Sequence, residues 1–580
     1  MTVKLAETAG FCMGVRRAVD LVLDIARSRG RGKIYTYGPL IHNPQTVELL
    51  KKREIIPIED IDEIPAGEEG AVLVIRTHGI SPEQRRRIKE KGIKILDATC
   101  PKVAHVQAII KKHIARGYTI IIAGDEVHPE VAGLLGYAAD RGIVVGSRTD
   151  VDKLPPLDRV GIVAQTTQDI DLFGEIVTAV KKRFPHAVVF DTICDSTEKR
   201  QKEVKNLAAR MEAMVIVGGR NSANTRRLAE ISEHQGTPTF YVETAEELKN
   251  HPLCIYNSIG VSAGASTPNW IIDRVVNNIT SYQAPGGKRA KSFFMLWLFL
   301  VRTDIYASAG AGCLYLASAL IQKFDLHLPY FLIAALYVYA MHILNRFMDK
   351  KAGIIGSFRE ETYLEREFLF IPLAVAALIS ALILAIVQGL RPFLLLFLIS
   401  FLGILYNANI LPQGRHFRSL RELPGSKNVS MAMAWAMVTA VLPGLDVGFS
   451  VSAGMVVAFL FVFTVVFIRS VMSDILDIQN DRLIGRETIP VIAGRENAQK
   501  ILKGIWALLF ALLALSFPAG WSTSVVIALL ACLFYILISF KLCDRRTALS
   551  GMVLAGLLES NYIIAGISAL LWLIFIGRGI

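Results

Sequence analysis

Three cysteines in the first half of this 580-residue chain have similar local surroundings. Cys12, Cys100 and Cys194 each stand where a turn or strand end is expected to meet a helix start, and they are 88 and 94 residues apart. A helix N-terminus favours a thiolate over a thiol. Three thiolates at one centre would suit a [4Fe–4S] cluster with one iron left open for a substrate. No Cys-x-x-Cys pair is present, so small buried residues at helix starts remain an alternative.

Three histidines repeat alongside the cysteines. His42, His78 and His128 each follow an apolar, strand-like run and precede a turn residue. Open α/β sheets bind their ligands in the loops at the carboxyl ends of strands. Three imidazoles that converge there could donate N–H hydrogen bonds to an anionic substrate when protonated. A single histidine in such a loop is usually a solvated turn residue, but three in one context favour a binding site.

Two loops are rich in small hydroxyl and amide residues. Residues 219–225 read Gly-Arg-Asn-Ser-Ala-Asn-Thr and follow an apolar run at 215–218. Residues 260–267 read Gly-Val-Ser-Ala-Gly-Ala-Ser-Thr and follow a second run at 254–259. Backbone and side-chain donors in such loops can surround phosphate oxygens. Each loop alone is equally compatible with an ordinary turn.

The elements that must position these residues alternate between β-like runs and helical patterns. The clearest runs are 71–76, 118–124 and 213–218. This alternation predicts an α/β domain with mostly parallel strands. Because the cysteine segments form an internal repeat, we expect three lobes of similar size that bring the three cysteines to a common centre.

Composition divides the chain into two unlike parts. A mean hydropathy of +0.43 is high for a soluble protein, whereas 20% charged residues are many for a pure membrane protein. We therefore expect a domain at 1–280, a Pro- and Gly-containing linker at 281–292 and a membrane domain at 293–580. The net charge of +12 lies mainly beside apolar spans, which favours a lipid bilayer over nucleic acid as the partner. Charges recur from Lys4, so no signal peptide is expected, and the first domain is predicted to be cytoplasmic.

An ordered set of motifs in residues 3–280 resembles the LytB/IspH family of 4-hydroxy-3-methylbut-2-enyl diphosphate reductases. The motifs are Phe-Cys-Met-Gly-Val, Ile-His-Asn-Pro, Arg-Thr-His-Gly, Asp-Ala-Thr-Cys-Pro, His-Pro-Glu, Gln-Thr-Thr, Thr-Ile-Cys, Asn-Ser-x-Asn-Thr and Ala-Gly-Ala-Ser-Thr-Pro. The resemblance implies a three-lobed, pseudo-threefold α/β fold around a [4Fe–4S] cluster. It also implies production of isopentenyl and dimethylallyl diphosphate by the methylerythritol phosphate pathway, with reduced ferredoxin or flavodoxin as electron donor.

The same resemblance assigns roles to individual residues. Cys12, Cys100 and Cys194 would hold the cluster. Glu130 would supply protons, with Thr166 near the leaving hydroxyl. The diphosphate would be bound by His42, His78, His128, Ser222, Asn224 and Ser266. The remaining cysteines, Cys254 included, match no role and are expected to be buried apolar residues.

The second half predicts an all-α bundle of nine transmembrane helices. Apolar stretches of spanning length are found at about 302–321, 328–344, 367–388, 392–411, 428–446, 450–470, 500–519, 523–540 and 553–576. The even-numbered loops carry sixteen Lys and Arg residues, whereas the opposite loops carry two. This asymmetry predicts a multi-pass protein of the inner (plasma) membrane with the N-terminus inside and the C-terminus outside.

Acidic residues gather after the second and sixth predicted spans. Asn345 and Asp349 are four residues apart, as are Asp477 and Asp481, so each pair is expected on one helix face. Asp474 precedes the second pair. Carboxylates in basic loops suit Mg²⁺ that bridges a diphosphate. Ordinary charged loop residues are the alternative, and they explain the first pair better than the second cluster.

This arrangement resembles the UbiA superfamily of membrane prenyltransferases over residues 293–580. The second acidic motif matches well, whereas the first departs from Asn-Asp-x-x-Asp-x-x-x-Asp because Arg346 and Gly353 replace two of its acids. The resemblance implies that Mg²⁺ and the acids ionise an allylic diphosphate, whose prenyl group passes to a lipophilic acceptor. Lys427 is a further candidate for a diphosphate contact, and Glu559 lies within an apolar span. A membrane anchor with degraded catalysis is the alternative.

Overall fold

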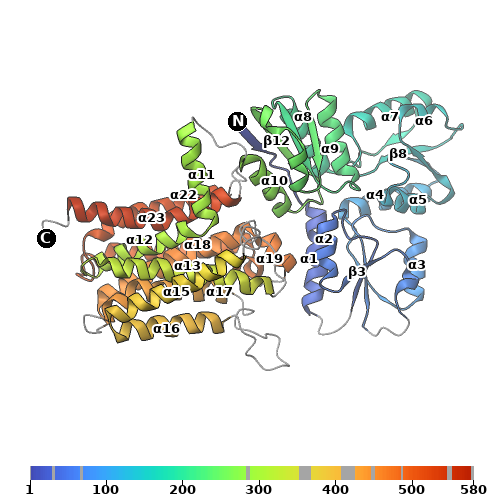
Figure 1. Ribbon diagram of the computed structural model, residues 1–580. Helices are drawn as coiled ribbons and strands as arrows, with labels where there is room; N and C mark the ends of the chain where they lie inside the picture. The colour runs from blue at the N-terminus through green and yellow to red at the C-terminus, as the bar shows by residue number, and fades with distance from the viewer. Residues whose placement is uncertain are drawn as a thin grey trace. The chain divides into compact units, whose positions relative to one another are not determined.

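The computed structural model describes residues 2–28, 33–65, 70–281, 288–351, 367–406, 425–445, 451–484, 488–544 and 551–576. It divides into two compact units, Met1–Gln283 and Ala284–Ile580 (Figure 1). The predicted linker at 281–292 is partly helical, because α10 ends at Ser281 and α11 begins at Lys288. Residues 282–287 of that linker lie outside the described part of the chain.

The first unit contains three sheets of four parallel strands each, as the internal repeat predicts. The first has the order β1 (Thr2–Leu5), β12 (Ser258–Ala263), β10 (Ala213–Val217) and β11 (Thr239–Val242). The second has the order β3 (Ile55–Ile58), β2 (Ile34–Tyr37), β4 (Val72–Ile75) and β5 (Lys94–Asp97). The third has the order β7 (Gly142–Val145), β6 (Thr119–Ala123), β8 (Val160–Ala164) and β9 (Val188–Val189).

The central strands of these sheets are buried on both faces. β4 and β10 are buried along their whole length, which explains why they appear in the sequence as continuous runs of Val, Ile and Leu. The helices between the strands are α1 (Met13–Ser28), α2 (Pro44–Lys51), α3 (Pro82–Glu90), α4 (Pro101–Ile114), α5 (Pro129–Ala138), α6 (Arg148–Asp152), α7 (Ile170–Arg183), α8 (Asp195–Ala208), α9 (Ala223–His234) and α10 (Asn269–Ser281).

One predicted loop is wrong in part. The sequence predicts a polar loop at 260–267 after an apolar run at 254–259, whereas β12 covers Ser258–Ala263. The strand lies between β1 and β10, and a Cβ at Gly260 would come within 2.3 Å of the Met214 Sδ. Small residues are therefore needed where the neighbouring strand's side chain approaches, and this gives a buried central strand the composition of a loop.

The second unit is helical throughout its described residues. Its helices are α11 (Lys288–Arg302), α12 (Ile305–Ile321), α13 (Leu328–Lys351), α15 (Glu367–Gln388), α16 (Leu390–Leu405), α17 (Ser426–Ala436), α18 (Ala453–Leu476), α19 (Ile478–Ile484), α20 (Ile489–Ala493), α21 (Arg495–Ser516), α22 (Val525–Asp544) and α23 (Gly551–Phe575). α17 continues through a π turn and a 3-10 turn to give an apolar segment, Ser426–Leu445.

Seven described helical segments are long and apolar enough to cross a membrane, and the bent pair α11–α12 would make eight. The pair turns by 80°, and Asp304, with a left-handed φ of 55°, lies at the bend. α16 covers the fourth predicted span but has only 16 described residues. The described residues therefore give a multi-pass helical membrane unit in which seven or eight segments reach spanning length, fewer than the nine spans that the sequence predicts.

Close helix contacts in this unit depend on small residues. A Cβ at Gly310 of α12 would lie 2.8 Å from the Tyr562 Cβ, and a Cβ at Gly566 of α23 would lie 2.4 Å from the Cys313 Cβ. The glycines let α12 and α23 approach each other, as is usual where packing rather than water drives helix association.

Candidate active sites

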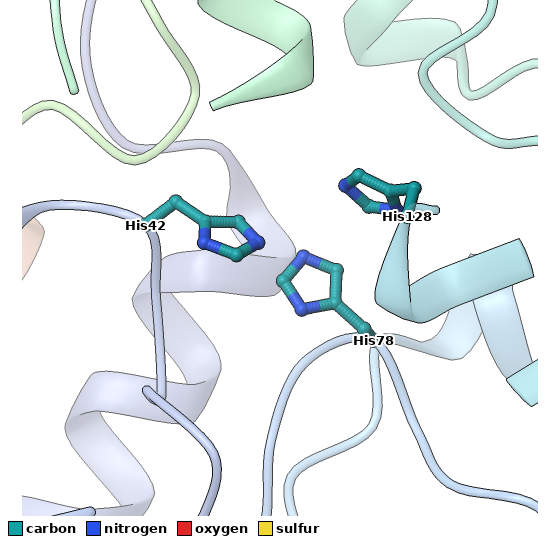
Figure 2. Close-up of side chains that lie close together, drawn as sticks. All are labelled: His42, His78 and His128. Atoms are coloured by element: carbon teal, nitrogen blue, oxygen red, sulfur yellow. The ribbon is translucent and has the colours of Figure 1, made fainter. Parts of the chain in front are cut away.

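Three histidines meet at the carboxyl ends of their strands. His42 follows β2, His78 follows β4, and His128 follows β6 and caps the N-terminus of α5. The ring centroids of His42 and His78 are 4.7 Å apart, and those of His78 and His128 are 5.3 Å apart. Figure 2 shows the three rings turned toward one another. Strands from two different sheets therefore supply one cluster, as expected for loops at strand carboxyl ends.

The rings are held in their neutral form. Burial lowers the pKa of His128 to about 4, with a further contribution from nearby His42. Burial, followed by the other two imidazoles, lowers the pKa of His78 well below its usual value. Burial and the positive charge of Arg76 lower the pKa of His42. The three histidines can therefore take up protons when an anion binds beside them, because a negative charge favours the imidazolium form.

The first sheet, which contains β10 and β12, brings the polar loops to the same place. The Ser266 Oγ donates a hydrogen bond of 3.1 Å to the backbone O of His42. A Cβ at Gly219 would lie 2.7 Å from that same oxygen, so the loop after β10 also packs against the histidine segment. Ser222 is the N-cap of α9, and its hydroxyl accepts a bond from the Thr225 N.

Several buried polar atoms around this site have no hydrogen-bond partner among the described residues. They are the Nε2 of His42, the Nδ1 of His78 and the Nδ2 of Asn224. Buried polar atoms are normally paired, so a concentration of unpaired ones indicates a ligand site. The amide nitrogen of Asn224 is a donor and the ring nitrogens can become donors, which suits a ligand rich in acceptor oxygens.

Glu130 lies at the start of α5, two residues after His128. Its side chain is buried, and both of its carboxylate oxygens accept hydrogen bonds from Thr166 in the loop after β8. Burial raises the pKa of Glu130, although the two bonds from Thr166 act in the opposite direction. A buried carboxyl with a raised pKa can hold a proton near neutral pH.

The three predicted cysteines stand at helix starts, as expected. Cys12 directly precedes α1, and Cys100 and Cys194 are the N-caps of α4 and α8. A Cβ at Gly14 would lie 2.6 Å from the Cys100 Sγ and 3.9 Å from the Cys12 Sγ, so a glycine is needed between these thiols. Burial raises the pKa of Cys100, and the nearby Cys12 and Cys194 raise it further. Mutually repelling thiolates fit a cationic iron cluster, which would offset their charge.

The expectation for the remaining cysteines is wrong in part. Cys532 and Cys543 are buried and Cys313 is partly buried, but Cys254 is exposed. Cys254 falls in a short 3-10 turn, Leu253–Ile255, whose buried residue is Leu253. β12 begins only at Ser258, so Cys254 precedes the buried strand and lies at the surface.

In the second unit, Asp474 belongs to a buried polar group rather than to a loop. It lies in the last turns of α18, where its Oδ1 pairs with the Lys427 Nζ at 3.0 Å. The Asn428 Nδ2 donates to the Oδ2 of Asp474 at 2.8 Å. Lys427, predicted as a diphosphate contact, is half-exposed and joins this acid to the start of α17.

Asp477 and Asp481 do not share one helix face. α18 ends at Leu476, Asp477 is its C-cap, and Asp481 lies in the separate helix α19. Asp477 is exposed and Asp481 is buried, although the Asp481 N still donates to the Asp477 O at 2.9 Å. Asp477 and Asp481 are therefore still one turn apart, but this turn crosses the break between α18 and α19. Their two carboxylates have different environments.

The first acidic motif lies at the end of α13. Asn345 is partly buried, whereas the side chain of Asp349 and the whole of Gly353 lie outside the described residues. Arg346, which replaces an acid of the family motif, pairs with fully buried Asp304 at 2.9 Å. The His342 Nδ1 lies 3.7 Å from the same carboxylate oxygen. The substituted arginine thus has a defined partner.

A second buried ion pair connects α18 and α23. Arg469 pairs with Glu559, whose side chain is fully buried, so Glu559 faces the bundle as its place in an apolar span suggested. Neither ion pair could be predicted from the sequence, because the two partners of each pair are far apart in the chain. The only local signal was the presence of charged residues within apolar spans.

The two units match two different families. Residues 3–280 match the model of the LytB protein family, and residues 305–557 match that of the UbiA prenyltransferase family. The 4-hydroxy-3-methylbut-2-enyl diphosphate reductase of Geobacter sp. (strain M21) is 43% identical over 281 residues, which are 48% of this chain and 98% of that protein. The reductase of the same name from Aquifex aeolicus (strain VF5) is 43% identical over 278 residues, 47% of this chain and 94% of that protein.

Solved structures resemble each half. A Plasmodium falciparum E-1-hydroxy-2-methyl-but-2-enyl-4-diphosphate reductase is 30% identical, covers 47% of this chain and 86% of its own, and has a TM-score of 0.46. A UbiA homolog from Aeropyrum pernix K1 is 15% identical, covers 46% of this chain and 97% of its own, and has a TM-score of 0.37. From the family model and the relatives of 43% identity, the chain belongs to the LytB family through residues 3–280, and its residues 305–557 match the model of the UbiA prenyltransferase family.

Proposed function

We propose that the first unit reduces 4-hydroxy-3-methylbut-2-enyl diphosphate to isopentenyl and dimethylallyl diphosphate. The observation that carries this proposal is the histidine cluster with unpaired buried donors, in a unit that also gathers three thiols and a buried carboxyl. The relative from Geobacter carries this activity in its name and is covered almost completely by this half. The reaction consumes two electrons and two protons and releases the hydroxyl as water.

The diphosphate would be bound by donors from all three sheets. His42, His78 and His128 would supply ring N–H groups, and Asn224 would supply its unpaired amide nitrogen. Ser222 and Ser266 would add hydroxyls from the loops after β10 and β12. Burial of these side chains excludes water from the anion and strengthens each bond.

Cys12, Cys100 and Cys194 would hold a [4Fe–4S] cluster. When bound, it would supply the two electrons and a Lewis-acidic iron for the substrate oxygen. Glu130 would deliver the proton that turns the leaving hydroxyl into water. Thr166 would orient Glu130 through its two hydrogen bonds and lie beside that hydroxyl.

The test is a reductase assay on the full chain, purified anaerobically in detergent and reconstituted with iron and sulfide. With reduced methyl viologen as electron donor, the synthetic diphosphate should yield both five-carbon products, identified by mass spectrometry. A protein that carries its cluster and reduces none of the substrate would overturn the proposal.

We further propose that the second unit transfers a prenyl group from a prenyl diphosphate to a lipophilic acceptor. Asn345, Asp349, Asp474, Asp477 and Asp481 would bind Mg²⁺ with the diphosphate of the donor. The buried positions of Asp474 and Asp481 support an enzyme, because a simple anchor gains nothing from acids that cost free energy to bury. Arg346 would add a positive charge where the family motif has an acid.

A double variant, Asp477→Ala/Asp481→Ala, tests this second activity. Membranes that contain the wild-type chain should incorporate labelled prenyl diphosphate into lipid, and membranes with the variant should not. Equal incorporation by both would favour a membrane anchor. The same lipid extract would identify the acceptor.

We place the chain in the inner membrane with both sites on the cytoplasmic side. The basic residues of the even-numbered loops support this orientation. The reductase requires reduced electron carriers such as ferredoxin or flavodoxin, which also favours the cytoplasm for the first unit.

A further inference from the structure

The three helix starts that carry the cysteines contact one another. The Arg17 Nη1 in α1 donates a 3.1 Å hydrogen bond to the Thr99 O, directly before Cys100. The Lys102 Nζ at the start of α4 pairs with the Asp195 Oδ2 at the start of α8, at 3.0 Å. These contacts bring residues nearly 180 positions apart in sequence into one continuous surface.

That surface is exposed, and most of its charges are positive. Met13, next to Cys12, is 79% exposed, and the Lys102 side chain keeps 46% of its surface. The first five residues of α1 and α8 also expose Arg16, Arg17 and Lys199, against two negative charges, Asp195 and Glu198, and Glu198 pairs with Lys202. We call Met13, Arg16, Arg17, Lys102 and Lys199 the basic face. All three cysteines behind it are themselves partly exposed.

We propose that the basic face is the docking site for an acidic one-electron carrier protein. This inference rests on the proposed reductase function, which needs two electrons from outside for each turnover. The carrier would be oxidised by one electron at each of two encounters, and the site behind the face would be reduced. Carboxylates around the carrier's redox group would meet the basic face, which steers the two proteins together and fixes their orientation.

The position of the face supports this partner over a substrate. Its charged residues lie beside the cysteines at the helix N-termini, whereas the diphosphate donors lie in the strand-end loops with the histidines. Long-range transfer of single electrons needs only close approach of the carrier to the cysteines. The exposed Met13 offers an apolar centre within the charged rim, as is usual for transient protein contacts.

The test compares two electron donors on the full chain in detergent. Lys102→Glu/Lys199→Glu should raise the KM for a purified acidic ferredoxin about tenfold or more, and should weaken ferredoxin binding at low ionic strength similarly. Asp195→Lys should act in the opposite direction. Lys112→Glu is the matched control, because Lys112 is exposed on the same helix about 15 Å toward its other end. Turnover with reduced methyl viologen should be unchanged in all three variants.

Failure of the proposed reductase function and failure of the proposed docking site give different results. If methyl viologen drives no turnover even in the wild type, the proposed reductase function falls, and the binding measurement still tests the face. If the charge reversals leave ferredoxin KM and binding unchanged, or Lys112→Glu weakens them equally, the docking site is wrong. Loss of self-association rather than of ferredoxin binding would assign the face to a second copy of the chain and would also overturn the proposal.

Discussion

Thr166 donates hydrogen bonds to both carboxylate oxygens of Glu130, from its N to Oε1 at 2.7 Å and from its Oγ1 to Oε2 at 2.8 Å. Both bonds favour the ionised carboxylate, whereas burial favours the protonated acid. Burial is the larger effect, and the pKa of Glu130 is raised. The pair therefore fixes the carboxyl in position while leaving it able to hold a proton.

The first prediction is that Glu130→Gln slows the reductase about 100-fold or more while cluster absorption and substrate affinity remain. The amide keeps the shape and one acceptor oxygen but cannot release a proton to the leaving hydroxyl. Single-turnover kinetics with reduced protein would measure the effect. Turnover at the wild-type rate would remove Glu130 from the mechanism.

Thr166→Val is the control for this prediction. It removes the hydroxyl bond to Oε2 and keeps the backbone bond to Oε1. Because the lost bond lowers the pKa of Glu130, its loss should raise that pKa further. A rate that depends on protonated Glu130 falls as pH rises through this pKa, so the fall should move to higher pH in Thr166→Val. An unshifted profile would argue against Glu130 as the acid.

A second prediction concerns the cluster. Cys12→Ser, Cys100→Ser and Cys194→Ser should each lose the brown colour and most of the bound iron after anaerobic reconstitution. Cys254→Ser should keep both, and it is a demanding control because Cys254 is an exposed thiol open to the same reagents. Iron and sulfide content, together with absorption spectra, would show whether each variant holds the cluster. Full iron content in any of the first three variants would exclude that residue as a ligand.

The arrangement of the cysteines and histidines could be predicted from repeated local patterns, although each pattern alone had an ordinary structural alternative. A cysteine at the start of a helix, repeated three times at similar separations, favours three lobes whose helix starts converge. Histidines after β2, β4 and β6 reach one place because the carboxyl ends of parallel strands share an edge. Neither conclusion required knowing which distant side chains would touch.

Contacts between distant residues were not predictable in the same way. Arg346 reads as a damaged metal motif in the sequence, and its partner Asp304 is 42 residues away at a helix bend. The first residues of the predicted loop at 260–267 belong to strand β12, because Gly260 and Ser262 have turn-like composition and only the approach of β10 explains them. Composition reports local propensity, and packing against a neighbour overrides it.

The third prediction follows from the neutral histidine cluster. Inorganic pyrophosphate should bind with net uptake of protons at pH 7.5, because burial lowers all three histidine pKa values and a bound anion raises them. Affinity should therefore fall as pH rises. Calorimetry in two buffers of different ionisation enthalpy measures the proton number directly. His128→Asn should reduce it, and equal heats in both buffers for the wild type would contradict the prediction.

A fourth prediction concerns the buried pair of Arg346 and Asp304. Arg346→Met leaves the Asp304 carboxylate buried without its guanidinium partner, and removing one member of a buried pair costs about 3–5 kcal/mol. Thermal unfolding in detergent should show a clearly lowered Tm. Asp304→Asn/Arg346→Met removes both charges and should recover part of the loss. If the double variant is as unstable as the sum of the single variants, the two residues do not stabilise the unit as a pair.

The last prediction tests the orientation on which the shared compartment of the two sites depends. Ile576 directly follows the last described helix, α23, and is 56% exposed, whereas Lys541 is exposed in the last turn of the preceding helix, α22. The excess of basic residues in the even-numbered loops puts Lys541 inside and Ile576 outside. In a Cys254→Ser/Cys313→Ser background, Ile576→Cys should react with a membrane-impermeant maleimide in intact cells, and Lys541→Cys should react only after permeabilisation. Both sites are accessible to the reagent once the membrane is opened, so a failure to label cannot be blamed on burial. Labelling of Lys541→Cys in intact cells would reverse the bundle, and the acidic motifs of the second unit would then face away from the cytoplasmic reductase.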